Sequence, residues 1–70
     1  MDRKSGIEQI QSACDHIARE LMRIHPAVPA LGDTETQGKT YEALYRITTD
    51  VEVIKKLMLK LRGRDASTDL

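Results

Sequence analysis

The chain has 70 residues, enough for one domain (1–70), and it has little with which to build a core, since it contains two Tyr and neither Phe nor Trp. Eleven basic and eleven acidic residues give a formal net charge of zero, which excludes bulk charge as a reason to bind nucleic acid or an anionic membrane. No apolar run is long enough to span a membrane, and no signal-like segment follows the first residues. The single cysteine cannot form an internal disulfide. We therefore expect a cytoplasmic protein with no membrane contact.

A repeat of apolar residues at alternating spacings of three and four predicts a first helix over about 6–25. Ser5 and Glu8 have the spacing of a capping box that would start this helix. Pro26 would end it, because a residue before proline is pushed away from helical angles. The repeat consists of Ile7, Ile10, Cys14, Ile17, Leu21 and Ile24.

The connection at 26–33 contains both prolines and a glycine, which indicates an ordered turn. Val28 and Leu31 are apolar, so we expect this loop to fold back over the end of the helix pair. Two helices joined by so short a connection lie antiparallel. The fold class is thus all-α, an antiparallel two-helix hairpin.

A second helix is expected over about 34–62. Asp33 or Thr34 would cap it, which places Gly38 inside the helix at a cost of about 1 kcal/mol. Thr40 is the alternative cap, and we favour the earlier start.

The second helix should end at Gly63 in a left-handed cap, with residues 64–70 as a flexible tail. Its apolar residues are numerous, and we assign most of them to packing within the hairpin or between two copies of it. These are Leu44, Ile47, Val51, Ile54, Leu57, Met58 and Leu61.

A two-helix chain cannot cover so much apolar surface by itself, so we expect a homodimer that forms a four-helix bundle, with the subunits either parallel or antiparallel. Apolar and tyrosine side chains away from the main repeat are candidates for binding a different protein. They are Met22, Tyr41, Tyr45, Val53 and Leu59. The leading interpretation is a non-enzymatic interaction module that binds and regulates another protein as an inhibitor, anti-activator or assembly co-chaperone. A purely structural oligomerisation module is an alternative.

A basic cluster near the end of the second helix supports another alternative, a nucleic-acid-binding accessory protein. It comprises Lys55, Lys56, Lys60, Arg62 and Arg64. No interleaved aromatics or helix-turn-helix spacing accompany it, and cations at a helix C-terminus also complement the helix dipole.

The sequence indicates no catalytic, metal or cofactor site. Cys14 belongs to the apolar repeat, where a thiol acts as a small hydrophobic side chain. His16 is two residues away on a different helix face and cannot pair with it. His25, before Pro26, is best placed to cap the end of the first helix. The carboxylates are scattered, and a two-helix hairpin offers no water-excluded cleft for acid–base chemistry.

Overall fold

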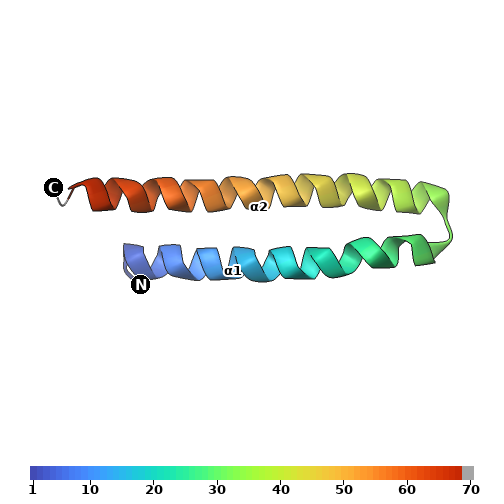
Figure 1. Cartoon of the computed structure of the whole chain (residues 1–70), viewed down its shortest axis with the longest axis horizontal. Coiled ribbons are helices and arrows are strands. Elements are labelled where there is room, and N and C mark those ends of the chain that lie inside the picture. Colours follow the sequence, from blue (N-terminus) through green and yellow to red (C-terminus); the bar gives the residue numbers. More distant parts are fainter. Residues whose placement is uncertain (69–70) are drawn as a thin grey trace.

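The computed structural model describes the backbone of residues 1–68 and the side chains of residues 1–64. This part of the chain is all-helical, with α1 (Arg3–Ile24), a short 3₁₀ helix η1 (His25–Leu31) and α2 (Thr34–Thr68). The two long helices lie side by side and antiparallel, with η1 at one end of the hairpin (Figure 1). The Cα atoms extend over 56 × 16 × 16 Å. Among the described residues, no further element covers either broad side of this rod.

The start of α1 differs from the prediction because Asp2, and not Ser5, is its N-cap. The Asp2 carboxylate accepts a hydrogen bond from the Ser5 backbone N–H at 2.7 Å, and the Asp2 carbonyl accepts one from the Gly6 N–H at 2.9 Å. The predicted capping box is wrong, since the Ser5 N–H that Glu8 would bind already donates to Asp2. A carboxylate at this point is also favoured by the helix dipole. The helix therefore begins three residues earlier than expected.

The turn between the helices is ordered by its apolar and glycine residues. Val28 is buried and forms a cluster with Leu21 and Leu44, while Leu31 is about half exposed. Of the two residues expected to fold back over the helix pair, only Val28 is buried. Gly32 then has φ 65° and ψ 22°, a left-handed conformation that favours glycine, and the chain reverses there.

Asp33 caps the second helix. Its carboxylate accepts a hydrogen bond from the Thr36 N–H at 3.1 Å and another from the Thr36 hydroxyl, and its carbonyl accepts one from the Gln37 N–H at 2.9 Å. α2 therefore begins at Thr34, the earlier of the two starts considered, and Gly38 lies inside it.

The predicted helix end at Gly63 is wrong, because α2 continues to Thr68. A left-handed glycine cap is usually accompanied by an apolar residue just after the glycine that packs back on the last turn. Arg64 stands at that position here, so such a cap would lack its hydrophobic contact. Of the expected flexible tail, residues 64–68 belong to α2, and residues 69–70 lie outside the described part of the chain.

The core of the hairpin is one narrow row of residues. Successive members of this row are seven positions apart, both along the first arm, which is α1 with η1, and along α2. Seven residues are close to two helical turns, so each row runs straight along one side of its helix. The buried residues are Ile7, Cys14, Leu21 and Val28 on the first arm and Leu44 and Val51 on α2, where Met58 continues the row half-buried. The hairpin thus buries only about half of the apolar repeat that the sequence displays.

Candidate interaction surface

A second row of apolar side chains runs beside the buried one on each helix, again at seven-residue spacing, and remains on the surface. We call it the isoleucine face. It consists of Ile10, Ile17 and Ile24 on α1 and Ile47 and Ile54 on α2, all between 39% and 43% exposed. Leu61, seven positions further along α2, is half-buried.

Contacts between the helices show on which side this face lies. Three contacts mark one broad side of the hairpin: Lys55 Nζ to Asp15 Oδ1 at 3.9 Å, Arg62 to Gln11 at 3.3 Å, and the rings of His25 and Tyr41 at a centroid distance of 6.0 Å. We call this the contact side.

Helix geometry places the isoleucines on the other side. Successive residues of an α-helix are rotated by about 100°. A side chain four positions after a buried residue therefore lies on one side of the buried row, and a side chain three positions after it lies on the other side. Gln11 is four positions after Ile7, and Ile10 is three positions after it. In the same way, Lys55 is four positions after Val51 and Ile54 is three positions after it. Because Gln11 and Lys55 both belong to the contact side, the isoleucines of both helices share the opposite broad side of the hairpin.

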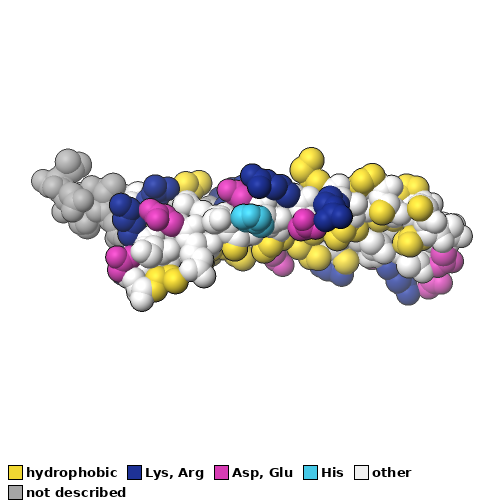
Figure 2. Space-filling model, turned by 90° about the horizontal axis from the view of Figure 1, so that it is seen from below, with side chains coloured by type: hydrophobic (Ala, Val, Ile, Leu, Met, Phe, Trp, Pro, Cys, Tyr) yellow, Lys and Arg dark blue, Asp and Glu magenta, His cyan; other side chains and the backbone are white. Residues whose placement is uncertain are grey.

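The isoleucine face is bordered mainly by small residues. The positions just before the buried residues fall next to it, and they are occupied by Gly6, Ala13, Ala27 and Ala43. Such side chains allow a second helix to approach closely. Figure 2, which looks onto the outer side of α1, shows hydrophobic side chains along the lower middle and over the right half of the molecule, with charged side chains at both long edges.

Two acidic residues and one large apolar residue occupy the same border. Glu20 precedes Leu21 and forms an ion pair with Arg23 at 2.9 Å, while Asp50 precedes Val51. Leu57 precedes Met58 and is more than half exposed. The face is therefore apolar along its length and acidic near its middle.

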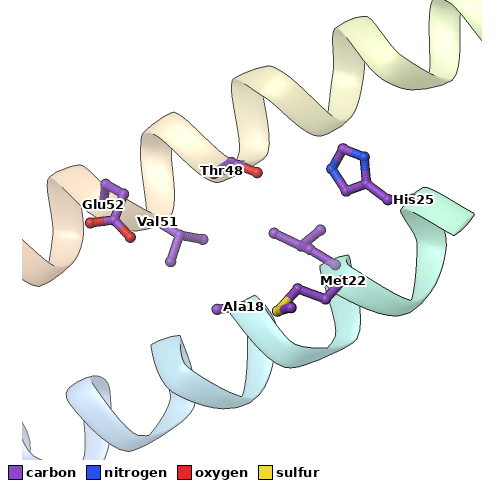
Figure 3. Close-up of a pocket in the computed structure, with 7 residues that line it drawn as sticks. Ala18, Met22, His25, Thr48, Val51 and Glu52 are labelled. Carbon is purple, nitrogen blue, oxygen red and sulfur yellow. The ribbon is translucent and has the colours of Figure 1, made fainter.

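A shallow groove of about 200 Å³ lies between the helices on the contact side (Figure 3). Its walls are formed by Ala18, Leu21, Met22, His25, Thr48, Val51 and Glu52. The volume is below the range of roughly 300–1,000 Å³ that is typical of small-molecule sites. The described residues include no group of three side chains that could hold a metal ion.

The residues predicted to bind another protein are all exposed, but not on one surface. Met22, Tyr45 and Leu59 are 73%, 76% and 60% exposed. Each directly follows a residue of the buried row, so each turns toward the contact side, away from the isoleucine face. Tyr41 lies against His25 on that same side, while Val53 points outward from α2.

The five basic residues of the predicted nucleic-acid surface divide into two groups. Lys55 and Arg62 lie on the contact side, where Lys55 pairs with Asp15 and, at 3.6 Å, with Glu52. Lys56, Lys60 and Arg64 follow one another at four-residue spacing, which aligns them along the outer side of α2. The structure thus does not gather the five cations into one patch.

The residues with possible chemistry are separated as well. Cys14 is 2% exposed within the buried row. His16 is on the surface, with Nδ1 2.8 Å from the carbonyl oxygen of Ser12 one turn earlier.

Sequence reasoning did not assign Gly6, Ala27 and Ala43 to this surface. The seven-residue spacing that connects Gly6 to Ala13, Glu20 and Ala27 was the signal that could have found the first two.

No helix in the described part of the chain is long and apolar enough to cross a membrane. Comparison with known protein families, with curated proteins and with solved structures found no match to this chain.

Proposed function

We propose that this chain is a non-enzymatic interaction module that forms a homodimer through the isoleucine face and binds and regulates another protein through the opposite side. Two such hairpins, packed face to face, make a four-helix bundle. The observation that carries the proposal is the second apolar row, which has the regularity of a packing seam and no partner among the described residues. A reducing cytoplasm suits the lone buried cysteine.

Burial of the isoleucine face is large enough to offset much of the cost of association. Completing the burial of each half-exposed aliphatic side chain is worth on the order of 1 kcal/mol. A dimer buries the face of both copies, which brings the total gain to the scale of the association cost, about 4–15 kcal/mol. The small residues beside the isoleucines permit the close contact that this gain requires.

The contact side would remain open in such a dimer. Met22, Tyr45 and Leu59 lie there, and long apolar and tyrosine side chains are frequent anchors of protein interfaces. This separation of two apolar surfaces supports a protein that assembles with itself on one side and with a different protein on the other. Inhibitor, anti-activator and assembly co-chaperone are the forms of regulation that fit a small binding module.

Self-association is tested by light scattering across a dilution series. Wild-type protein should have twice the 7.9 kDa chain mass, and Ile17→Asp and Ile54→Asp should give 7.9 kDa. Gln9→Asp, an exposed position away from the face, is the matched control and should remain dimeric. A wild-type monomer at all concentrations, with full helicity, contradicts the dimer.

Partner binding is tested separately with Tyr45→Ser and Leu59→Ser. Both should remain dimers and lose a protein that wild type captures reproducibly, while Glu42→Ser, on the outer side of α2, should retain it. Equal capture by all four proteins would count against the contact side. Capture of nothing by wild type would favour a purely structural oligomerisation module.

A further inference from the structure

We propose that the second copy docks on the isoleucine face with its turn at the opposite end of the bundle, so that α1 packs on α1 and α2 on α2. This inference rests on the self-association proposed above and specifies its geometry. A two-fold dimer with both turns at one end would instead pack α1 of each copy on α2 of the other.

The charges at the two ends of the hairpin favour opposite orientation. The open end has the basic side chains Arg3, Lys4, Lys60, Arg62 and Arg64, against the acidic Asp2 and Glu8. Two more acidic residues, Asp65 and Asp69, follow in the sequence, outside the described side chains.

The turn end is acidic. Asp33, Glu35 and Glu42 lie there against Lys39, which pairs with Glu35 at 3.0 Å, and Arg46, one turn after Glu42. Opposite orientation places each basic end beside an acidic turn, whereas the same orientation places two basic ends together. Complementary charge of this kind fixes the orientation of partners more than it adds affinity.

The border of α1 is also self-complementary when reversed. Ala13 and Ala27 stand seven residues before and after Glu20. With a two-fold axis near Glu20, Ala13 of one copy meets Ala27 of the other, and two small side chains bring the helices close together. The isoleucine row has the same symmetry, because Ile17 of one copy then faces Ile24 of the other.

The ion pair at the centre fits this reversal. Glu20 and Arg23 are bound within each copy at 2.9 Å. With the two-fold axis near Glu20, the Glu20 carboxylates of the two copies come close together, and each is bound by the Arg23 guanidinium of its own helix. These two ion pairs reduce the repulsion between the facing glutamates.

Engineered cysteines in the full chain test the orientation. Ala13→Cys and Ala27→Cys proteins, mixed and treated with a short bismaleimide, should form a cross-linked heterodimer, and neither should cross-link with itself. In the alternative arrangement the cross-link forms between Ala13→Cys and Leu57→Cys. Wild type is the control for Cys14, whose burial should keep it unreactive in folded protein.

A distance measurement provides a second readout. Spin labels on Lys39→Cys, near the turn, should be on the order of 35–40 Å apart in the dimer, from a rise of 1.5 Å per residue along the hairpin. Labels much closer than this, at a separation set by the width of the bundle and not by the length of the hairpin, would overturn the orientation while leaving the dimer intact. A monomeric mass for these labelled proteins and for wild type would overturn the self-association itself, so the two failures are distinguishable.

Discussion

The carboxylate of Asp33 accepts hydrogen bonds from both the hydroxyl and the backbone N–H of Thr36. The hydroxyl contact is the larger cause, and together the two bonds hold the pKa of Asp33 below its ordinary value of 3.8. The Asp2 carboxyl has a lowered pKa for a related reason, chiefly its bond from the Ser5 backbone. Both helices therefore begin at a charged cap.

These caps predict that the hairpin loses stability in acid. A carboxyl whose folded pKa is depressed stabilises the fold above its unfolded pKa, here 3.8, and the contribution is lost as pH falls through the lower folded pKa. Thermal unfolding midpoints from pH 6 down to pH 2 should show this loss. Asp33→Asn can still cap the helix but has no charge, so its curve should fall less steeply below pH 4. Parallel curves for the two proteins would contradict the prediction.

The cap at Asp2 predicts a contrast between two neighbouring substitutions. Asp2→Ala removes the acceptor of the Ser5 N–H, so hydrogen exchange at the Ser5 and Gly6 amides should become faster. Ser5→Ala should leave this exchange nearly unchanged, because the serine hydroxyl is not the cap and alanine favours helix. The capping box expected from the sequence would give the reverse order.

The helix starts show why local patterns only partly determine element boundaries. Asp2 and Ser5 are both good capping residues, and the pattern Ser5–Glu8 is the more distinctive in sequence. The carboxylate prevails in the structure because it satisfies the Ser5 N–H and adds a favourable charge at the helix start. At the second helix the sequence left Asp33, Thr34 and Thr40 as candidate caps, and the structure selects Asp33 although Thr34 has Gln37 three residues later. At Gly63 the sequence pattern predicted a helix end that the structure does not have, because a glycine permits a helix to end but does not require it.

The glycines predict opposite responses to alanine. Gly63 and Gly38 lie inside α2, and apart from the helix backbone no heavy atom of the described residues would be within 4 Å of an added Cβ. Alanine at either position should stabilise the protein by about 0.5–1 kcal/mol in urea unfolding. Gly32→Ala should destabilise it by about 1 kcal/mol, because φ is 65° there. Loss of stability in Gly63→Ala would mean that the helix ends at Gly63 after all.

Neighbouring apolar residues on α2 predict different dependence on protein concentration. Leu44 is buried with Leu21 and Val28, so Leu44→Ala should cost about 2–4 kcal/mol at every concentration. Ile47 lies on the isoleucine face, so Ile47→Ala should cost little in dilute, monomeric protein and more as dimers form. Unfolding at several concentrations distinguishes them. If Ile47→Ala lowered the free energy of unfolding by the same amount at every protein concentration, as expected for a core residue, this would contradict the place of Ile47 at an interface.

The sequence alone could not separate these two rows. Leu44 and Ile47, like Leu21 and Ile24, are both on the apolar arc of an amphipathic helix, and the alternating repeat assigns them equally to packing. Which of them becomes buried depends on how each helix is rotated about its axis against the other. That rotation depends on how the two helices fit together, which also brings distant residues such as Arg62 and Gln11 into contact, and no local pattern contains it.

Asp50 predicts that the dimer tightens when a charge is removed. It lies beside the isoleucine face near the middle of the hairpin, and the described side chains form no ion pair with it, in contrast to Glu20. In either orientation of a two-fold dimer it meets an acid, because the opposing residue is Asp50 itself or Glu20 of the other copy. Asp50→Asn should therefore lower the dimer dissociation constant by about two- to fivefold, more at low salt than at high salt.

The matched control for Asp50→Asn is Glu42→Gln, an acid on the outer side of α2, which should leave the dissociation constant unchanged. Sedimentation at two salt concentrations measures both variants. An Asp50→Asn dimer that is weaker than wild type would contradict the prediction, because Asp50 would then meet a cation of the other copy, such as Arg23, and not an acid.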